Sequence, residues 1–116
     1  MKMRIANQQS VCEWINAKPL RPIAGSKLGI ALSTLGKLPI HGLRQAPTET
    51  TNGWYIWCGG EISRDPDFFA PLHIEHMNEH LPKAIEYLDL PPGYRFLIGD
   101  SNYEDVWFDA ALLNTV

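Results

Sequence analysis

Hydrophobic residues change their spacing along the chain, and each spacing predicts a different kind of element. Near the start they recur at offsets of three and four, which is the spacing of one helix face, so residues 6–17 are expected to form a helix. The residues on that face are Val11, Trp14 and Ile15. Ser10 followed by Glu13 has the pattern of a capping box, which would begin a shorter version of this helix, and Pro19 ends it.

The middle of the chain predicts strands. Residues 23–38 alternate in part between apolar and polar positions, and their glycines disfavour a helix, so one or two strands with a turn are expected there. Residues 45–53 are polar and end in Asn-Gly, which is typical of a loop that closes in a turn. Residues 54–58 are apolar or aromatic on both faces, so they are predicted to form a central strand that is covered on both sides.

The last third predicts helices followed by a hairpin. An apolar stripe predicts helices near 72–80 and 82–88, which are separated because Pro82 suits the first turn of a new helix better than a helix interior. After a rigid Pro-Pro-Gly turn, residues 94–99 and 104–109 have the pattern of two antiparallel strands joined by a tight turn.

Together these elements predict the α+β class, because strands and helices are mixed without a βαβ rhythm. We expect a single compact domain over residues 1–116, with an antiparallel or mixed sheet, an N-terminal helix and a broken central helix. No signal peptide and no membrane span are recognisable, so a cytoplasmic location without membrane contact is expected. Cys12 and Cys58 are interpreted as free thiols, with one disulfide between them as the alternative.

The charge of the chain bears on its partners. Acidic residues outnumber basic ones 13 to 10, the net charge is −3, and no basic run exceeds two residues. Proteins that bind nucleic acid need lysine and arginine to displace counterions from phosphates, so nucleic acid is not expected as a partner. A basic protein is the more natural one.

Aromatic and acidic residues are interleaved in the second half of the chain. All four tyrosines, all four phenylalanines and three of the four tryptophans lie there, which is enough for a core with aromatic surface left over. The side chains interpreted as core are Trp54, Ile56, Tyr94, Phe96, Val106 and Phe108.

The strand predicted at 104–109 has one face that is poorly suited to a core. Alternation places Asp105, Trp107 and Asp109 on that face, and such a mixture of charged and aromatic side chains is either a solvated surface or a binding surface. The residues predicted to remain for a partner are Glu61, Asp65, Asp67, Glu104, Asp105, Trp107 and Asp109. A second copy of the chain could use the same face, giving a homodimer.

Three histidines suggest a metal site as an alternative. On one continuous helix His73, His76 and His80 would fall within an arc of about 60°, and they could hold zinc with an open position for water. With Glu61 as base, this would be a small metal-dependent hydrolase. The spacing is not the HExxH pattern, and the arc borders the apolar stripe, where histidines usually pack their rings. Neither Cys58 nor the paired acids have local support as catalytic groups, so no catalytic residue is predicted.

Several short runs between Gly53 and Asp109, about half of the chain, resemble a known family. The runs are Gly53-Trp54-Tyr55-Ile56-Trp57 with Gly60-Glu61, Asp67-Phe68-Phe69 with Pro71-Leu72-His73, Leu90-Pro91-Pro92-Gly93-Tyr94-Arg95-Phe96, and Glu104-Asp105-Val106-Trp107-Phe108-Asp109, with Pro39-Ile40 and Arg44 as weaker additions. In these runs the chain resembles the immunity-protein-thirty-three-like group of bacterial polymorphic toxin systems.

The resemblance implies an α+β domain without enzymatic activity and without a cofactor. Proteins of this kind protect the producing cell by binding a cognate toxin, often by covering its active site. The resemblance does not identify that toxin or the residues that touch it. A regulatory or scaffold domain with another partner is the remaining alternative.

Overall fold

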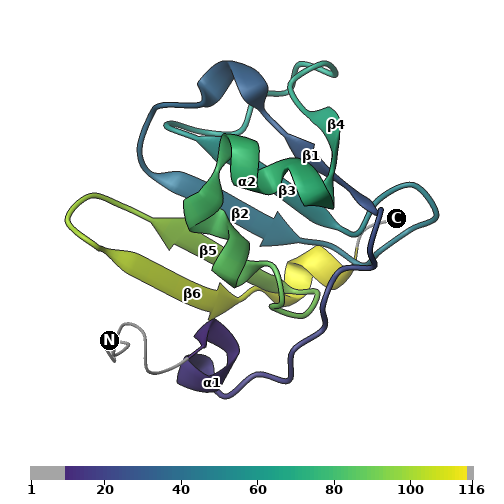
Figure 1. The fold of residues 1–116 in the computed structure, drawn as a ribbon, viewed down its shortest axis with the longest axis vertical. Coiled ribbons are helices and arrows are strands. Elements are labelled where there is room, and N and C mark those ends of the chain that lie inside the picture. Colours follow the sequence, from purple (N-terminus) through teal and green to yellow (C-terminus); the bar gives the residue numbers. More distant parts are fainter. Residues whose placement is uncertain (1–9, 115–116) are drawn as a thin grey trace.

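The computed structural model describes residues 10–114, which form a mixed β-sheet with short helices packed on one face (Figure 1). Within this range the strands are β1 (Lys27–Ile30), β2 (Ile40–Arg44), β3 (Trp54–Cys58), β4 (Ala70–His73), β5 (Tyr94–Ile98) and β6 (Glu104–Phe108). The α-helices are α1 (Val11–Ile15) and α2 (Met77–His80). The 3-10 helices are η1 (Leu32–Thr34), η2 (Ile74–His76), η3 (Pro82–Tyr87) and η4 (Ala110–Leu113).

The six strands of the described range follow the order β4-β1-β3-β2-β5-β6, so β4 and β6 are the two edges. β1 runs parallel to β3, and all the other neighbouring pairs are antiparallel. The sheet is therefore mixed, and the predicted α+β class is confirmed. The hairpin predicted at 94–99 and 104–109 is also confirmed, with Tyr94 opposite Phe108 and Ile98 opposite Glu104.

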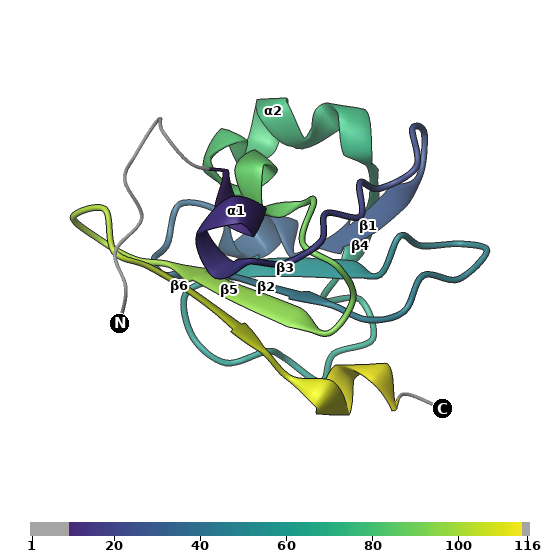
Figure 2. The ribbon, with the colours of Figure 1, turned by 90° about the horizontal axis from the view of Figure 1, so that it is seen from below.

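The two faces of the sheet are covered differently. Figure 2 shows α1, α2 and η3 on one face, which we call the helical face, and the 59–69 loop with η4 beneath the other, which we call the second face. Trp54, Ile56 and Cys58 point into the main core under the helices. Trp57 points to the second face and is still only 4% exposed. The prediction that 54–58 is a central strand with cover on both sides is therefore confirmed.

Helix α1 is the shorter version of the predicted N-terminal helix. The Ser10 hydroxyl accepts a hydrogen bond from the Glu13 main-chain N–H at 3.1 Å, and the Glu13 carboxylate accepts one from the Ser10 N–H at 3.2 Å. The capping box is therefore present. The helix ends at Asn16, which adopts a left-handed conformation (φ 58°). The part of the prediction at 6–9 lies outside the described residues.

Replacing Ser10 with alanine is expected to lower the free energy of unfolding by about 1 kcal/mol, because the Glu13 N–H loses its acceptor. Urea denaturation measures the change. Ser33→Ala is the matched control, since that exposed serine lies in η1 and should change stability by less than about 0.5 kcal/mol. Equal effects of the two variants would contradict the capping role.

The central helix is broken at the predicted place but begins later than predicted. Leu81 separates α2 from η3, and Pro82 is the first residue of η3, as the proline pattern indicated. The start at residue 72 is wrong, because Leu72 and His73 belong to β4 and pair with Leu28 and Lys27 of β1. The second segment, 82–87, is a 3-10 helix.

Strand β2 lies in the middle of the sheet, although the sequence pattern does not predict it. Gly42 at its centre has a low strand propensity, but here it leaves room for the ring of Phe96 on β5. A Cβ on Gly42 would lie 2.1 Å from Phe96 Cε2, so any larger residue collides with the ring. Phe108 is a second difference: it is 51% exposed and not core, because it lies at the end of edge strand β6.

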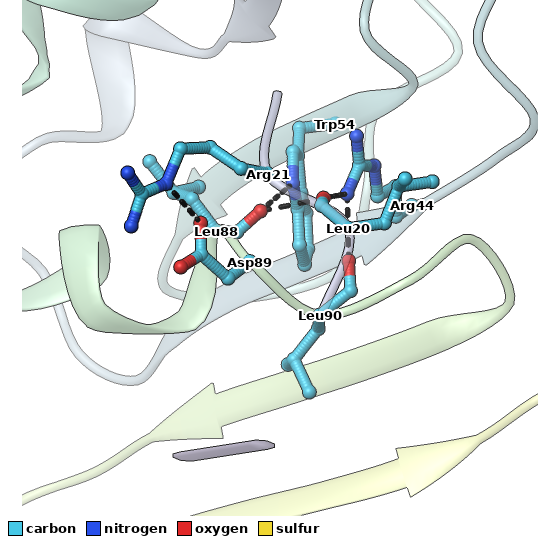
Figure 3. A network of polar contacts seen from close by, with 7 residues as sticks. All are labelled: Leu20, Arg21, Arg44, Trp54, Leu88, Asp89 and Leu90. Atoms are coloured by element: carbon cyan, nitrogen blue, oxygen red, sulfur yellow. Dashed lines mark hydrogen bonds and ion pairs between the residues drawn. The ribbon is translucent and has the colours of Figure 1, made fainter. Parts of the chain in front are cut away.

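Arg44, the last residue of β2, is buried with 2% of its surface exposed. Its Nη1 donates hydrogen bonds to the carbonyl oxygens of Leu20 at 2.6 Å and Leu90 at 2.7 Å, and its Nε donates to that of Asn52 at 3.1 Å. The guanidinium carbon lies 5.7 Å from the centre of the Trp54 ring. Figure 3 shows how the bonds to Leu20 and Leu90 join chain segments that are distant in sequence.

Candidate functional site

The second face of the sheet carries a group of packed rings, which we call the aromatic cluster. Its members are His41, Tyr55, Trp57, Phe68 and Phe69. The His41 and Trp57 rings stack with centroids 4.8 Å apart and planes 12° apart, and Phe69 meets both Tyr55 and Trp57 edge-on. Because Phe68 and Phe69 come from the chain before β4, the cluster fastens the 59–69 loop beneath the sheet (Figure 2).

Three of the acids that the sequence singled out lie on this loop. Glu61, Asp65 and Asp67 are exposed, and the Asp65 carboxylate accepts a hydrogen bond from the Asp67 main-chain N–H at 2.9 Å. The aromatic cluster attaches the end of this loop to the sheet, so the loop that bears these carboxylates is held in place at that end. The carboxylates lie on the same loop as Phe68 and Phe69, whose rings are partly buried.

The strand β6 contributes the other predicted residues of this face. Asp105 lies opposite Leu97 and Trp107 opposite Arg95. The Arg95 guanidinium carbon lies 5.7 Å from the Trp107 ring centre, and Arg95 Nη1 donates to the Asp109 carboxylate at 3.2 Å. Trp107 is 38% exposed, and its ring rests against Arg95.

The Asp109 side chain makes two contacts within the protein. Besides the ion pair with Arg95, its carboxylate accepts a hydrogen bond from the Ala111 N–H at 3.1 Å and caps η4. Removing this side chain would therefore disturb the local fold as well as the surface. Asp109 is a poorer probe of binding than the acids on the 59–69 loop.

Glu104 is placed apart from the other predicted residues. Alternation along β6 turns it to the helical face, where its carboxylate accepts a hydrogen bond from the hydroxyl of Tyr87. The acidic residues predicted to contact a partner therefore do not all lie on one face. The face that joins the 59–69 loop to β6 comprises Glu61, Asp65, Asp67, Asp105, Trp107 and Asp109.

The histidines do not lie on one helix face, because the continuous helix that this required is not formed. His73 ends β4, His76 lies in η2 and His80 ends α2. The His73 ring faces the Gly25 carbonyl at 3.1 Å, and the His76 ring faces the Glu79 carboxylate at 3.1 Å. Among residues 10–114 no group of three histidine, cysteine or acidic side chains is placed to hold a metal ion.

The cysteines are buried and free. Burial raises the pKa of the Cys58 thiol, with an opposing effect from its hydrogen bond with Thr34, and burial also raises that of Cys12. A raised pKa keeps the thiol protonated, which is the opposite of what a nucleophile requires. The structure thus supports the interpretation of Cys58 as a small buried apolar residue.

The family of the chain follows from its sequence over nearly all of this fold. The model of the Imm33-like domain matches residues 7–109. The chain belongs to the Imm33-like family. The match confirms the resemblance found in the second half and extends it through β1 and β2 to the N-terminal helix. The chain matches no curated protein and no solved structure.

The Imm33-like family is a family of immunity proteins. Such families are generally non-catalytic. Within residues 10–114 no helix is long and apolar enough to cross a membrane.

Two residues that matter here were not found from the sequence. His41 belongs to the aromatic cluster because β2 pairs with β3 and places His41 opposite Trp57. The sequence pattern did not predict β2, so it could not predict this contact. Arg95 supports Trp107, but a single arginine in an apolar strand gave no specific signal. Its position opposite Trp107 follows from the hairpin register, so the register would have revealed it.

Proposed function

We propose that this Imm33-like protein is an immunity protein that neutralises a cognate toxin by binding it with the second face of the sheet. The observation that carries the proposal is the exposed Trp107, braced by Arg95, on the same face as the loop acids. An aromatic anchor with a polar rim is the usual anatomy of a protein interface. The protein acts as a binding module in the cytoplasm of the producing cell and needs no catalytic group.

The charge of this face favours a basic partner. Glu61, Asp65, Asp67 and Asp105 outnumber Arg64 of the 59–69 loop, and Arg95 of the β5–β6 hairpin is already paired with Asp109. A surface with an excess of acidic side chains speeds association with a basic surface and makes it depend on salt. A basic toxin domain, such as a nuclease, has the complementary charge.

The proposal is tested first by growth. A candidate toxin domain is expressed with and without this protein, and we expect cells that make the toxin domain to grow only when they also make this protein. The purified pair should form a stable complex in gel filtration. Continued toxicity together with the absence of a complex would overturn the proposal.

Charge reversal on the loop is expected to slow association. The double variant Glu61→Lys and Asp67→Lys should lower the association rate constant with the toxin domain about tenfold at low salt, and the difference should shrink as salt is added. Both side chains are exposed, so the melting temperature should stay nearly unchanged. Stopped-flow fluorescence of the tryptophans measures the rate.

The matched control is the double variant Glu49→Lys and Glu79→Lys. It makes the same change in net charge, but Glu49 lies in the loop between β2 and β3 and Glu79 in α2 on the helical face. If both doubles slow association equally, the effect is one of net charge and the second face is not the docking surface.

A further inference from the structure

The sheet ends in two edges that differ in their ability to accept another strand. The β4 edge contains Pro71, which has no N–H to donate, and β4 spans four residues. The β6 edge spans five residues and contains no proline, lysine or glycine. Natural sheets often protect exposed edges with proline, lysine or other charged side chains. In β6 such protection is confined to Glu104 and Asp105 at its start, and Val106 to Phe108 carry none.

The hydrogen-bond pattern shows which main-chain groups of β6 face outward. The Gly99 N–H donates to the Tyr103 carbonyl at 2.8 Å, and the Asp109 N–H donates to the Gly93 carbonyl at 2.7 Å. Hydrogen-bonded pairs alternate with non-bonded pairs along an antiparallel ladder. Residues 105 and 107 therefore turn their N–H and C=O groups toward β5, whereas Val106 and Phe108 turn theirs away from the sheet.

In the described part of the chain no strand lies beyond Val106 and Phe108. Their N–H and C=O groups are spaced as a strand partner requires. The aromatic side chains of Tyr103, Trp107 and Phe108 are all exposed around this edge. An added strand would thus find both main-chain partners and apolar contacts for its alternate side chains.

The charge around the β6 edge indicates which kind of segment could pair with it. The hairpin from Tyr94 to Asp109 carries four acidic side chains and one basic one. A second copy of this chain would bring two such acidic hairpins together, and like charges side by side on neighbouring strands are destabilising. A segment with lysine or arginine would instead face Asp100 and Asp105.

We propose that β6 is a docking edge on which a basic, extended segment of the toxin adds as a further strand of the sheet. The proposal rests on the proposed function and specifies how the partner is held. Main-chain hydrogen bonds to Val106 and Phe108 supply affinity, and the acids beside them supply the preference for a basic segment. The side chains of the added strand extend the second face next to Trp107.

Amide hydrogen exchange, read by NMR on the intact protein, tests this inference. In the free protein the Val106 and Phe108 amides should exchange at least about tenfold faster than those of Asp105 and Trp107, which are bonded to β5. On binding the toxin domain, the Val106 and Phe108 amides should slow by about a hundredfold or more. If they remain fast in a complex that forms, the inference fails while the immunity function stands.

A main-chain variant gives a second readout. Val106→Pro removes an outward N–H without removing a bond to β5, so toxin affinity should fall at least about tenfold. Val106→Thr, which keeps the N–H and the branched shape, should bind like the wild type. Unchanged affinity of a folded Val106→Pro would overturn the inference, and the exchange measurement decides the matter if that variant does not fold.

Two further outcomes are informative. Protection of Val106 and Phe108 that appears without toxin and grows with protein concentration would mean that a second copy occupies the edge, which overturns the inference. A toxin domain that is neither bound nor neutralised by the wild type would overturn the proposed function, and the inference with it.

Discussion

Replacing Arg44 with methionine is expected to lower the free energy of unfolding by about 4 kcal/mol. The guanidinium supplies the hydrogen bonds for the main-chain carbonyls of Leu20, Asn52 and Leu90. Methionine fills a similar volume but donates nothing, so buried carbonyls lose their donors, and each such loss costs about 1–3 kcal/mol. Domains of this size have stabilities of about 5–15 kcal/mol, so the variant should be close to unfolding.

A buried charge does not stabilise every protein. Whether Arg44 raises or lowers the free energy of unfolding depends on which groups its guanidinium contacts. Burial lowers the pKa of Arg44, with an opposing effect from Asp89, so holding this cation carries a desolvation penalty. Buried ion pairs can be replaced by apolar residues because both partners are removed together. The partners of Arg44 are main-chain carbonyls, which no single substitution removes.

Urea denaturation of Arg44→Met and of Arg21→Met measures the effect. Arg21 forms an ion pair with Asp89 at 3.6 Å, but its side chain is 84% exposed, so its loss should change stability by less than about 0.5 kcal/mol. Arg44→Lys keeps the charge but not the forked geometry and should still lose about 2 kcal/mol. If Arg44→Met were as stable as the wild type, the network would have no net stabilising role.

Replacing Gly42 with alanine is expected to lower the free energy of unfolding by about 3 kcal/mol, because the added methyl group overlaps the Phe96 ring. The new Cβ would lie 2.1 Å from Cε2 and 2.3 Å from Cζ of that ring. Phe96 cannot easily move aside, since it stacks on Tyr87 with ring centroids 4.7 Å apart and touches Trp54. The backbone of β2 is held between β3 and β5.

Gly60→Ala is the matched control for Gly42→Ala. Apart from its chain neighbours, a Cβ on Gly60 would meet no atom of residues 10–114 within 4 Å, so this substitution should change stability by less than about 0.5 kcal/mol. The double variant Gly42→Ala and Phe96→Leu tests the cause, because a smaller side chain relieves the overlap. Its cost should be less than the sum of the two single costs, and simple additivity would contradict the collision.

The sequence predicts those elements that have a regular period and a clear end. Strand β3 and the β5–β6 hairpin were recognisable because apolar residues alternate and turn residues follow. Helix α1 was recognisable because its capping box is local. The six-stranded order was not accessible, since the parallel β1–β3 pairing joins segments separated by the whole of β2.

The failures have equally specific causes. Strand β2 was missed because Gly42 disfavours a strand locally and is accepted only because the Phe96 ring needs the space. The start of the central helix was misplaced because an apolar stripe does not distinguish the end of an edge strand from a helix turn. That error produced the histidine cluster.

The facing of the side chains on β6 was predictable, but the geometry around them was not. Alternation placed Asp105 and Trp107 on one face, and the hairpin register agrees. Alternation also turns Glu104 away, and its bond to Tyr87 fixes it there. The attachment of the 59–69 loop through Phe68 and Phe69 depends on contacts across the sheet, which no local pattern encodes.

The partners of Arg44 also bear on how the chain folds while it is being synthesised. Leu90 follows Arg44 by 46 residues, so β2 and β3 leave the ribosome well before the carbonyl that completes the network. Until then the cation has to remain in water, because burying it without partners is costly. We expect the sheet to stay open over Trp54 until residue 90 has emerged, and then to close with most of the domain available at once.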